Sequence, residues 1–187
     1  AATGGTGPYN YQWQDSPDGV TWTSIGGATA LTYSPPALTS TTHYRILVTD
    51  TGIPSCGTAI PSNTVIITVR ANLSASVATA SQTICYNTVP APLTATAATG
   101  GTGPYTYQWQ DSPDGVTWTS IGGATALTYS PPALTATTQY HLVATDAGTP
   151  PCGTVTSNAL IITVRANLLA SVATASQTIC YNTVPAP

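Results

Sequence analysis

The sequence predicts an all-β protein built from tandem antiparallel β-sandwiches, with about seven strands in each repeat. Three observations support this class: an internal repeat of about 95 residues, runs in which apolar and polar residues alternate, and turn motifs rich in Gly, Pro and Asp between those runs. Alternation with period two is typical of strands that are buried on one face. Short strands separated by tight turns pack as two facing sheets.

The internal repeat divides the chain into two units and a remainder. GGTGPYNYQWQDSPDG at Gly4 returns as GGTGPYTYQWQDSPDG at Gly100, and residues 11–39 recur unchanged as residues 107–135. A period of this length is the size of one small domain. We therefore expect three parts: a repeat lacking its first strand at 1–70, a complete repeat at 71–165, and the first strand of the next repeat at 166–187.

The strands of the complete repeat follow from its alternating runs. In chain order these runs are QTICYNTV, LTATAA, YTYQWQ, TQYHLVATD and ALIITV, with SPDG, IGGAT, SPPALT and DAGTPPCG as turns between the later ones. Alternation places Tyr140, Leu142 and Ala144 on an inner face, opposite an outer face that carries Gln139, His141 and Val143. The aromatic residues expected in the cores of the two repeats are Trp13, Trp109, Tyr44 and Tyr140.

Trp109 on the third strand and Tyr140 near the start of the sixth match the core tryptophan and corner tyrosine of immunoglobulin-like sandwiches. With these residues in place, the succession YQWQ, SPDG, TW, IGGAT, YSPPALT and YH resembles the immunoglobulin-like (PKD-like) tandem repeats of secreted and cell-surface adhesins and filaments of Bacteroidota. The resemblance covers the whole repeat. It implies a spacer, stalk or adhesive array, and it transfers no catalytic residue. We therefore expect no enzymatic activity and no cofactor.

The composition argues against some classes of binding partner. Charged residues make up 5% of the chain, which has a net charge of −3 and no Lys. Without a basic patch, we expect neither nucleic acid nor an anionic membrane surface as a partner. No apolar run is long enough to span a bilayer. A chain with so little charge repulsion associates readily with itself. We expect an extracellular or cell-surface protein whose partners are copies of itself, head to tail, and glycans or a neighbouring cell surface.

The cysteines give a second indication of assembly. Cys85 and Cys152 are the two cysteines of the complete repeat, so a disulfide within it would join them and would require an oxidising compartment. Cys56 and Cys180 each lie in an incomplete part, and we expect them to pair between neighbouring units.

The C-terminal segment is expected to complete a neighbouring repeat by adding a strand to it. Two versions remain open: separate subunits that exchange this strand, or one continuous polypeptide of which this chain is a repeating part. The strand expected to pass to the neighbour comprises Ser176, Gln177, Thr178, Ile179, Cys180, Tyr181, Asn182, Thr183 and Val184.

Other candidate sites carry less weight. The SPDG turns offer Asp15, Asp18, Asp111 and Asp114 to a calcium ion, but two carboxylates per turn fall short of a full ligand shell, and an Asx turn explains the same letters. Trp22 and Trp118, with Tyr33 and Tyr129, are the candidate platforms for glycan stacking. They support an alternative function, a carbohydrate-binding module array of a secreted protein, although packing in the core is the favoured interpretation.

Overall fold

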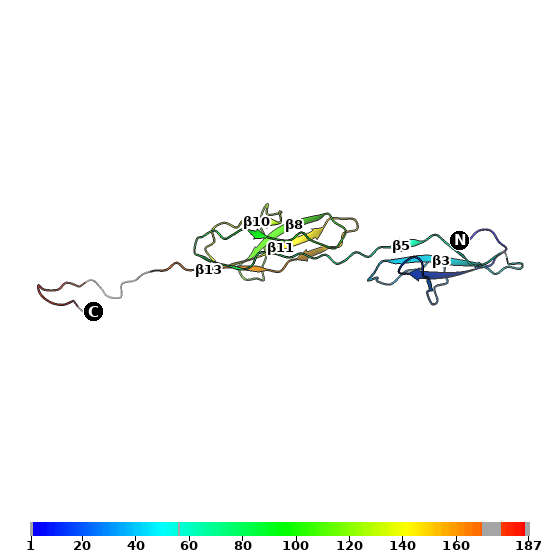
Figure 1. The fold of residues 1–187 in the computed structure, drawn as a ribbon, viewed down its shortest axis with the longest axis horizontal. Helices are drawn as coiled ribbons and strands as arrows, with labels where there is room; N and C mark the ends of the chain where they lie inside the picture. Colours follow the sequence, from blue (N-terminus) through cyan, green and yellow to red (C-terminus); the bar gives the residue numbers. More distant parts are fainter. Residues whose placement is uncertain (1, 56, 170–176, 186–187) are drawn as a thin grey trace. The chain divides into compact units, whose positions relative to one another are not determined.

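The computed structural model describes residues 2–55, 57–169 and 177–185, which form strands, turns and extended loops. The chain divides into two compact units (Figure 1). The first unit contains residues 1–72 with 100–102, and the second, called here the complete unit, contains residues 73–99 with 103–187. No helix long and apolar enough to cross a bilayer occurs among the described residues.

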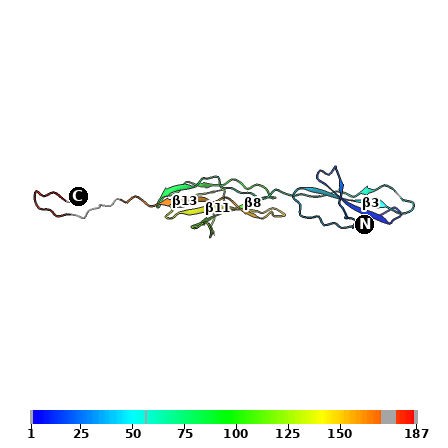
Figure 2. The same cartoon turned by 90° about the horizontal axis from the view of Figure 1, so that it is seen from below.

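The complete unit is a two-layer sandwich (Figures 1 and 2). Its large sheet has the strand order β6-β13-β11-β8-β9, with β12 beside β11, and its second layer contains the pair β7-β10. The strands are β6 (Gln82–Cys85), β7 (Leu93–Thr94), β8 (Tyr105–Ser112), β9 (Thr119–Ser120), β10 (Thr128–Tyr129), β11 (Thr138–Asp146), β12 (Thr154–Thr156) and β13 (Leu160–Arg165).

The first unit repeats the centre of that large sheet. Its strand order is β2-β1-β3-β4, with β5 beside β3. Its described residues form no counterpart of β6, β7 or β10, so its sheet lacks the second layer. The strands are β1 (Tyr9–Ser16), β2 (Thr23–Ser24), β3 (Thr42–Asp50), β4 (Ile60–Pro61) and β5 (Val65–Ile67).

The core of the complete unit lies between its two layers. Trp109 and Leu142 of the large sheet and Leu93 of the second layer are all fully buried. The Trp109 indole nitrogen donates to the carbonyl of Ala126 at 2.9 Å, which satisfies the one polar group of the buried ring. The other buried members of this cluster are Val77, Leu134, Tyr140, Leu160 and Ile162.

The structure confirms an all-β sandwich class with one difference. Among the described residues, the strand pairs are antiparallel except β6 with β13, which run parallel from Ile162 opposite Gln82 to Arg165 opposite Cys85. The chain first crosses the second layer, where Val77 bridges to Ala95, and only then reaches the edge of the large sheet. That path brings β6 to the edge in the same direction as β13.

Candidate strand-acceptor surface

Residues 71–94, of which 73–94 belong to the complete unit, form an opening segment that covers the inner face of the large sheet and extends its edge. At the edge, Tyr86 N donates to Arg165 O at 2.8 Å. At the end of the segment, Asn87 N donates to Leu134 O at 2.8 Å and Leu134 N donates to Thr88 O at 3.1 Å. The segment is therefore fixed by backbone hydrogen bonds along its length, as β-strand addition requires.

A side-chain amide holds the middle of the opening segment. Asn158 Oδ1 accepts from Val77 N at 2.9 Å, and Asn158 Nδ2 donates to Val77 O at 3.3 Å. Ser81 Oγ accepts from Ile161 N at 3.0 Å. These bonds position the Val77 side chain, which is buried in the core.

The same face of the first unit is uncovered. Val65, the counterpart of Leu160, is 51% exposed where Leu160 is 2% exposed, and Ile67 is 37% exposed where Ile162 is fully buried. Full burial of one such side chain is worth about 2 kcal/mol. The first unit therefore leaves uncovered an apolar face that the complete unit buries.

Two adjoining hollows mark this uncovered face, and they share Ala2, Val48 and Ser62. The apolar floor, called here the acceptor groove, consists of Tyr11, Trp13, Leu31, Ile46, Val48 and Val65. Trp13 is half-buried, whereas Trp109 at the same place in the complete unit is fully buried. The groove is thus the counterpart of the surface that the opening segment covers in the complete unit.

A further copy of the opening segment begins after β13. Residues 171–187 repeat residues 76–92 letter for letter. Residues 177–185 are exposed throughout, and Tyr181 is 101% exposed. Of the strand predicted to pass to a neighbour, only Ser176 lies outside the described residues.

The CYNT turn of this copy has the same form as its covered counterpart. Thr183 donates to Cys180 O from its backbone nitrogen at 3.2 Å and from Oγ1 at 2.7 Å, as Thr88 donates to Cys85 O at 3.2 and 2.6 Å. Asn182 and Asn87 both take a left-handed conformation, with φ of 61° and 58°. This conformation is set by the local sequence, since Asn tolerates positive φ and the hydroxyl closes the turn.

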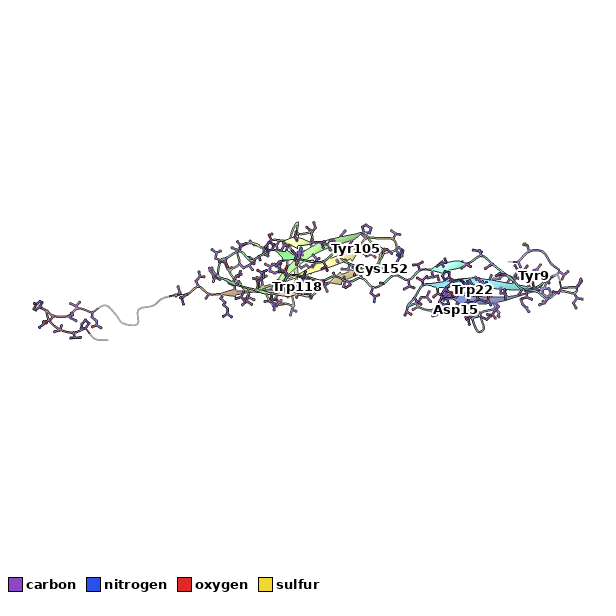
Figure 3. All side chains as sticks on the ribbon, in the orientation of Figure 1. Tyr9, Asp15, Trp22, Tyr105, Trp118 and Cys152 are labelled. Carbon is purple, nitrogen blue, oxygen red and sulfur yellow. The ribbon has the colours of Figure 1, made fainter. Side chains whose placement is uncertain are left out.

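The disulfide predicted between Cys85 and Cys152 is not formed, because Cys85 is a free, exposed thiol. The reason is topological. Cys85 pairs with Arg165, beyond the Thr138 end of β11, whereas Cys152 N donates to Asp146 Oδ2 at the other end of β11. Nine residues of strand span about 26 Å, and a disulfide requires Cα atoms within about 7 Å. Tyr105, which pairs with Asp146, also lies at the Cys152 end (Figure 3).

Cys56 lies outside the described residues, so its pairing with Cys180 stays a prediction.

The aromatic residues proposed for glycan stacking are engaged within each unit. Tyr129 packs between Trp109 and Tyr140 with centroid distances of 6.2 and 6.0 Å, and Tyr33 packs in the same way in the first unit. Trp118, labelled in Figure 3, stacks on His141 at 3.6 Å. His141 therefore lies on the outer face of the sheet, as predicted, but it is buried there beneath the indole. Tyr44 is likewise buried in the first unit.

The SPDG carboxylates act as turn caps. Asp114 Oδ1 accepts from Ser112 Oγ at 2.9 Å and from the backbone nitrogens of Val116 and Thr117 at 2.8 Å each. These hydrogen bonds, those from the Thr117 and Val116 backbone first, lower the pKa of Asp114 to about 2. Asp18 makes the same contacts in the first unit. Asp15 and Asp111 are strand residues paired opposite Tyr44 and Tyr140. No group of three metal-binding side chains gathers among the residues that the structure describes.

Comparisons with known proteins identify the domain family of the repeat, but they assign no activity to it. A family model described as "Domain of unknown function (DUF8696)" matches residues 1–71 and again residues 74–166. No curated protein matches the chain.

Among solved structures, the chain is similar to the fibronectin(III)-like modules of Clostridium thermocellum CbhA, with 15% identity and a TM-score of 0.34 over 88% of this chain and 83% of that one. It is also similar to the extracellular domain of protocadherin GammaB4, with 19% identity and a TM-score of 0.33 over 68% of this chain and 22% of that one.

Proposed function

Because the chain belongs to the DUF8696 family and carries two copies of its domain, we propose that it is a structural repeat of an extracellular bacterial filament or adhesin stalk. In this proposal its units are arranged head to tail, and residues 166–187 complete a neighbouring unit. The chain performs no catalysis in this role. The observation that carries the proposal is the contrast between two units of one chain, one with its apolar face covered and one with the same face open.

The open face and the segment that covers its counterpart are both present. The acceptor groove includes the counterparts of Trp109, Leu142 and Leu160, which pack in the core of the complete unit, and residues 171–187 repeat part of the opening segment. Adding the segment would bury side chains such as Val65 and Ile67 and would supply the partner that the β5 edge lacks. A contact of this kind between one end of a chain and the other end of the next does not close, so it generates a linear assembly.

Composition and packing agree with a structural role outside the cell. The chain carries few charges, and mutual association is useful in a polymer. The placement in Bacteroidota adhesins and filaments remains part of this proposal, as does the extracellular location. The carbohydrate-binding alternative is less well supported, because the indoles offered as platforms already stack on Arg45 or His141.

Sedimentation velocity and negative-stain electron microscopy of the purified chain test the proposal. We expect concentration-dependent linear assemblies of the full chain. A chain ending at Arg165 retains all strands of the complete unit and should remain monomeric. A full-length chain in which residues 171–187 are scrambled is the matched control for length and composition. Assembly that is equal in all three proteins would contradict strand donation, and a monomeric full chain would contradict the filament proposal.

The mass of native material under denaturing conditions distinguishes the two versions of the array. A species near 19.0 kDa indicates separate subunits, and its appearance only after reduction indicates that disulfides join them. A mass of many repeats that survives reduction indicates one continuous polypeptide.

A further inference from the structure

The proposed function leaves open where a donated segment would lie, and the complete unit supplies a template for answering this. We infer that the acceptor groove binds residues 166–183 of a second copy of this chain in one fixed register, set by Gly4 at one end and by Leu38 at the other. This inference rests on the proposed strand donation and adds its alignment to it.

The edge of the groove is already shaped for a parallel strand. In β13, the last three residues pair with β6 and with no other strand, and Thr163 lies opposite Thr83. In the first unit, β5 stops at Ile67, where a partner would be needed to extend it. The backbone beyond it is nevertheless held as in the complete unit, because Val69 N donates to Thr41 Oγ1 at 3.1 Å, as Val164 N donates to Thr137 Oγ1 at 3.0 Å. The template therefore places Thr178 of the donor opposite Thr68.

The Leu38 end of the groove matches the CYNT turn of the donor. Leu134, the counterpart of Leu38, exchanges two backbone hydrogen bonds with Asn87 and Thr88. The donor presents the same two groups on Asn182 and Thr183 in a turn that is formed before any contact is made. Less ordering of this turn is then needed on binding, which favours one alignment over its neighbours.

The other end is set by a glycine whose role differs between the two copies. A Cβ added to Gly100 would lie 2.0 Å from the carbonyl oxygen of Asn72, so this position must be glycine for the segment to pass. The next residue fixes the segment there, since Gly101 N donates to Ala71 O at 2.8 Å. Gly4 has the same φ, +82° against +81°, and nothing lies within 4 Å of its Cβ position. The empty space above Gly4 is where Asn167 of the donor would pass.

Between these two ends, the groove carries counterparts of the polar side chains that position the opening segment in the complete unit. Asn63 and Ser62 stand where Asn158 and Ser157 stand, and Ser62 Oγ accepts from Ile46 N at 3.1 Å as Ser157 Oγ accepts from Leu142 N at 2.9 Å. The Asn63 amide is thus placed to bind the donor backbone as Asn158 binds Val77. One donor residue at this position fixes the register of all the others, because a slip by one residue would turn every side chain to the opposite face.

Cysteine pairing between two chains tests the register. One chain carries Thr68→Cys and the other Thr178→Cys, both in a background in which the four native cysteines are replaced by serine, and the two are refolded together and oxidised. We expect an interchain disulfide, mapped by peptide mass, with a yield at least tenfold above that of the control pair Val69→Cys with Thr178→Cys, which is displaced by one residue. Equal yields for both pairs would overturn the inference.

Glycine substitutions give an independent test that needs no cysteine. Gly4→Ala should weaken assembly by tenfold or more, because its methyl group meets the donor backbone. Gly27→Ala is the matched control, since Gly27 has φ +74° and also has nothing within 4 Å of its Cβ position, but does not line the groove. Equal unfolding temperatures of the two variants show that Gly4→Ala folds. If the parent chain assembles and Gly4→Ala assembles equally well, the register is wrong. If the parent does not assemble at all, strand donation itself fails.

Discussion

The indole of Trp118 and the imidazole of His141 stack face to face, with ring centroids 3.6 Å apart and an angle of 15° between their planes. His141 Nε2 donates to Gln110 Oε1 at 2.7 Å. In the first unit the guanidinium of Arg45 lies 4.1 Å from the centre of the Trp22 ring. The two units therefore share one arrangement, with a titratable side chain in one and a permanent cation in the other.

We predict that the complete unit loses stability as the pH falls below 6.5. Burial lowers the pKa of His141 from its ordinary value of 6.5, so the folded state favours the neutral ring. The stabilisation is fully present above pH 6.5 and declines as the pH falls toward the pKa of the folded state. Thermal unfolding between pH 8 and pH 5 measures it. The variant His141→Arg, which copies Arg45, should lose most of this dependence, and a parent curve that is flat over the range would contradict the prediction.

The caps of the SPDG turns should give a second pH dependence at lower pH. The pKa of Asp114 is about 2 in the folded protein, below its ordinary value of 3.8, so its stabilisation is present above pH 3.8 and is lost as the pH falls toward 2. Asp114→Ala should lower the unfolding temperature at pH 7 and reduce the dependence on pH in this range. Thr117→Ala, which keeps the backbone donor, is the control. An unchanged unfolding temperature for Asp114→Ala would show that the cap does not stabilise the turn.

Equivalent core substitutions should lower the stability of the two units by different amounts. Leu142→Ala removes a fully buried side chain and should destabilise the complete unit by about 3 kcal/mol. Ile46→Ala, at the same place in the first unit, should cost less than half as much in the unassembled chain, because Ile46 lines the open groove. Chemical denaturation followed by hydrogen exchange assigns each loss to a unit. Equal losses would mean that the groove is covered in solution.

Reductant should leave the unfolding temperature of the unassembled chain unchanged. The Cys85 thiol and Cys152 lie toward opposite ends of one sheet, so no bond between these two residues can stabilise the complete unit. Calorimetry with and without reductant measures this. A lower unfolding temperature in reductant, together with a Cys85–Cys152 peptide in the oxidised sample, would contradict the structure.

Local patterns predicted the elements that depend on neighbours along the chain. Alternation in TQYHLVATD predicted β11, and YTYQWQ predicted most of β8. The internal repeat indicated that an opening segment belongs to each unit. The Asx interpretation of SPDG agrees with the contacts of Asp114, because that turn is closed by residues within three positions of one another.

Features set by distant contacts were not predictable in this way. Alternation in QTICYNTV predicts which side chains share a face, but it does not predict which strand is the partner or in which direction the two run. The parallel pairing of β6 with β13 was therefore not predicted. The separation of Cys85 from Cys152, which follows from that pairing, was not predicted either. His141 was placed on the correct face but is buried because Trp118 folds over it. The uncovered groove could be foreseen only from the repeat, by asking which side chains of the first unit have counterparts that an opening segment covers.

The parallel pairing of β6 with β13 has a mechanical consequence. Tension applied to the chain before β6 and after β13 pulls these two strands in opposite directions along their own axes. Their four residue pairs, from Ile162 with Gln82 to Arg165 with Cys85, are then loaded in shear and must break together, whereas strands pulled apart from one end would break one pair at a time. Single-molecule pulling would register this as a high unfolding force for the complete unit. The same sheet would resist force well along the chain and poorly across it.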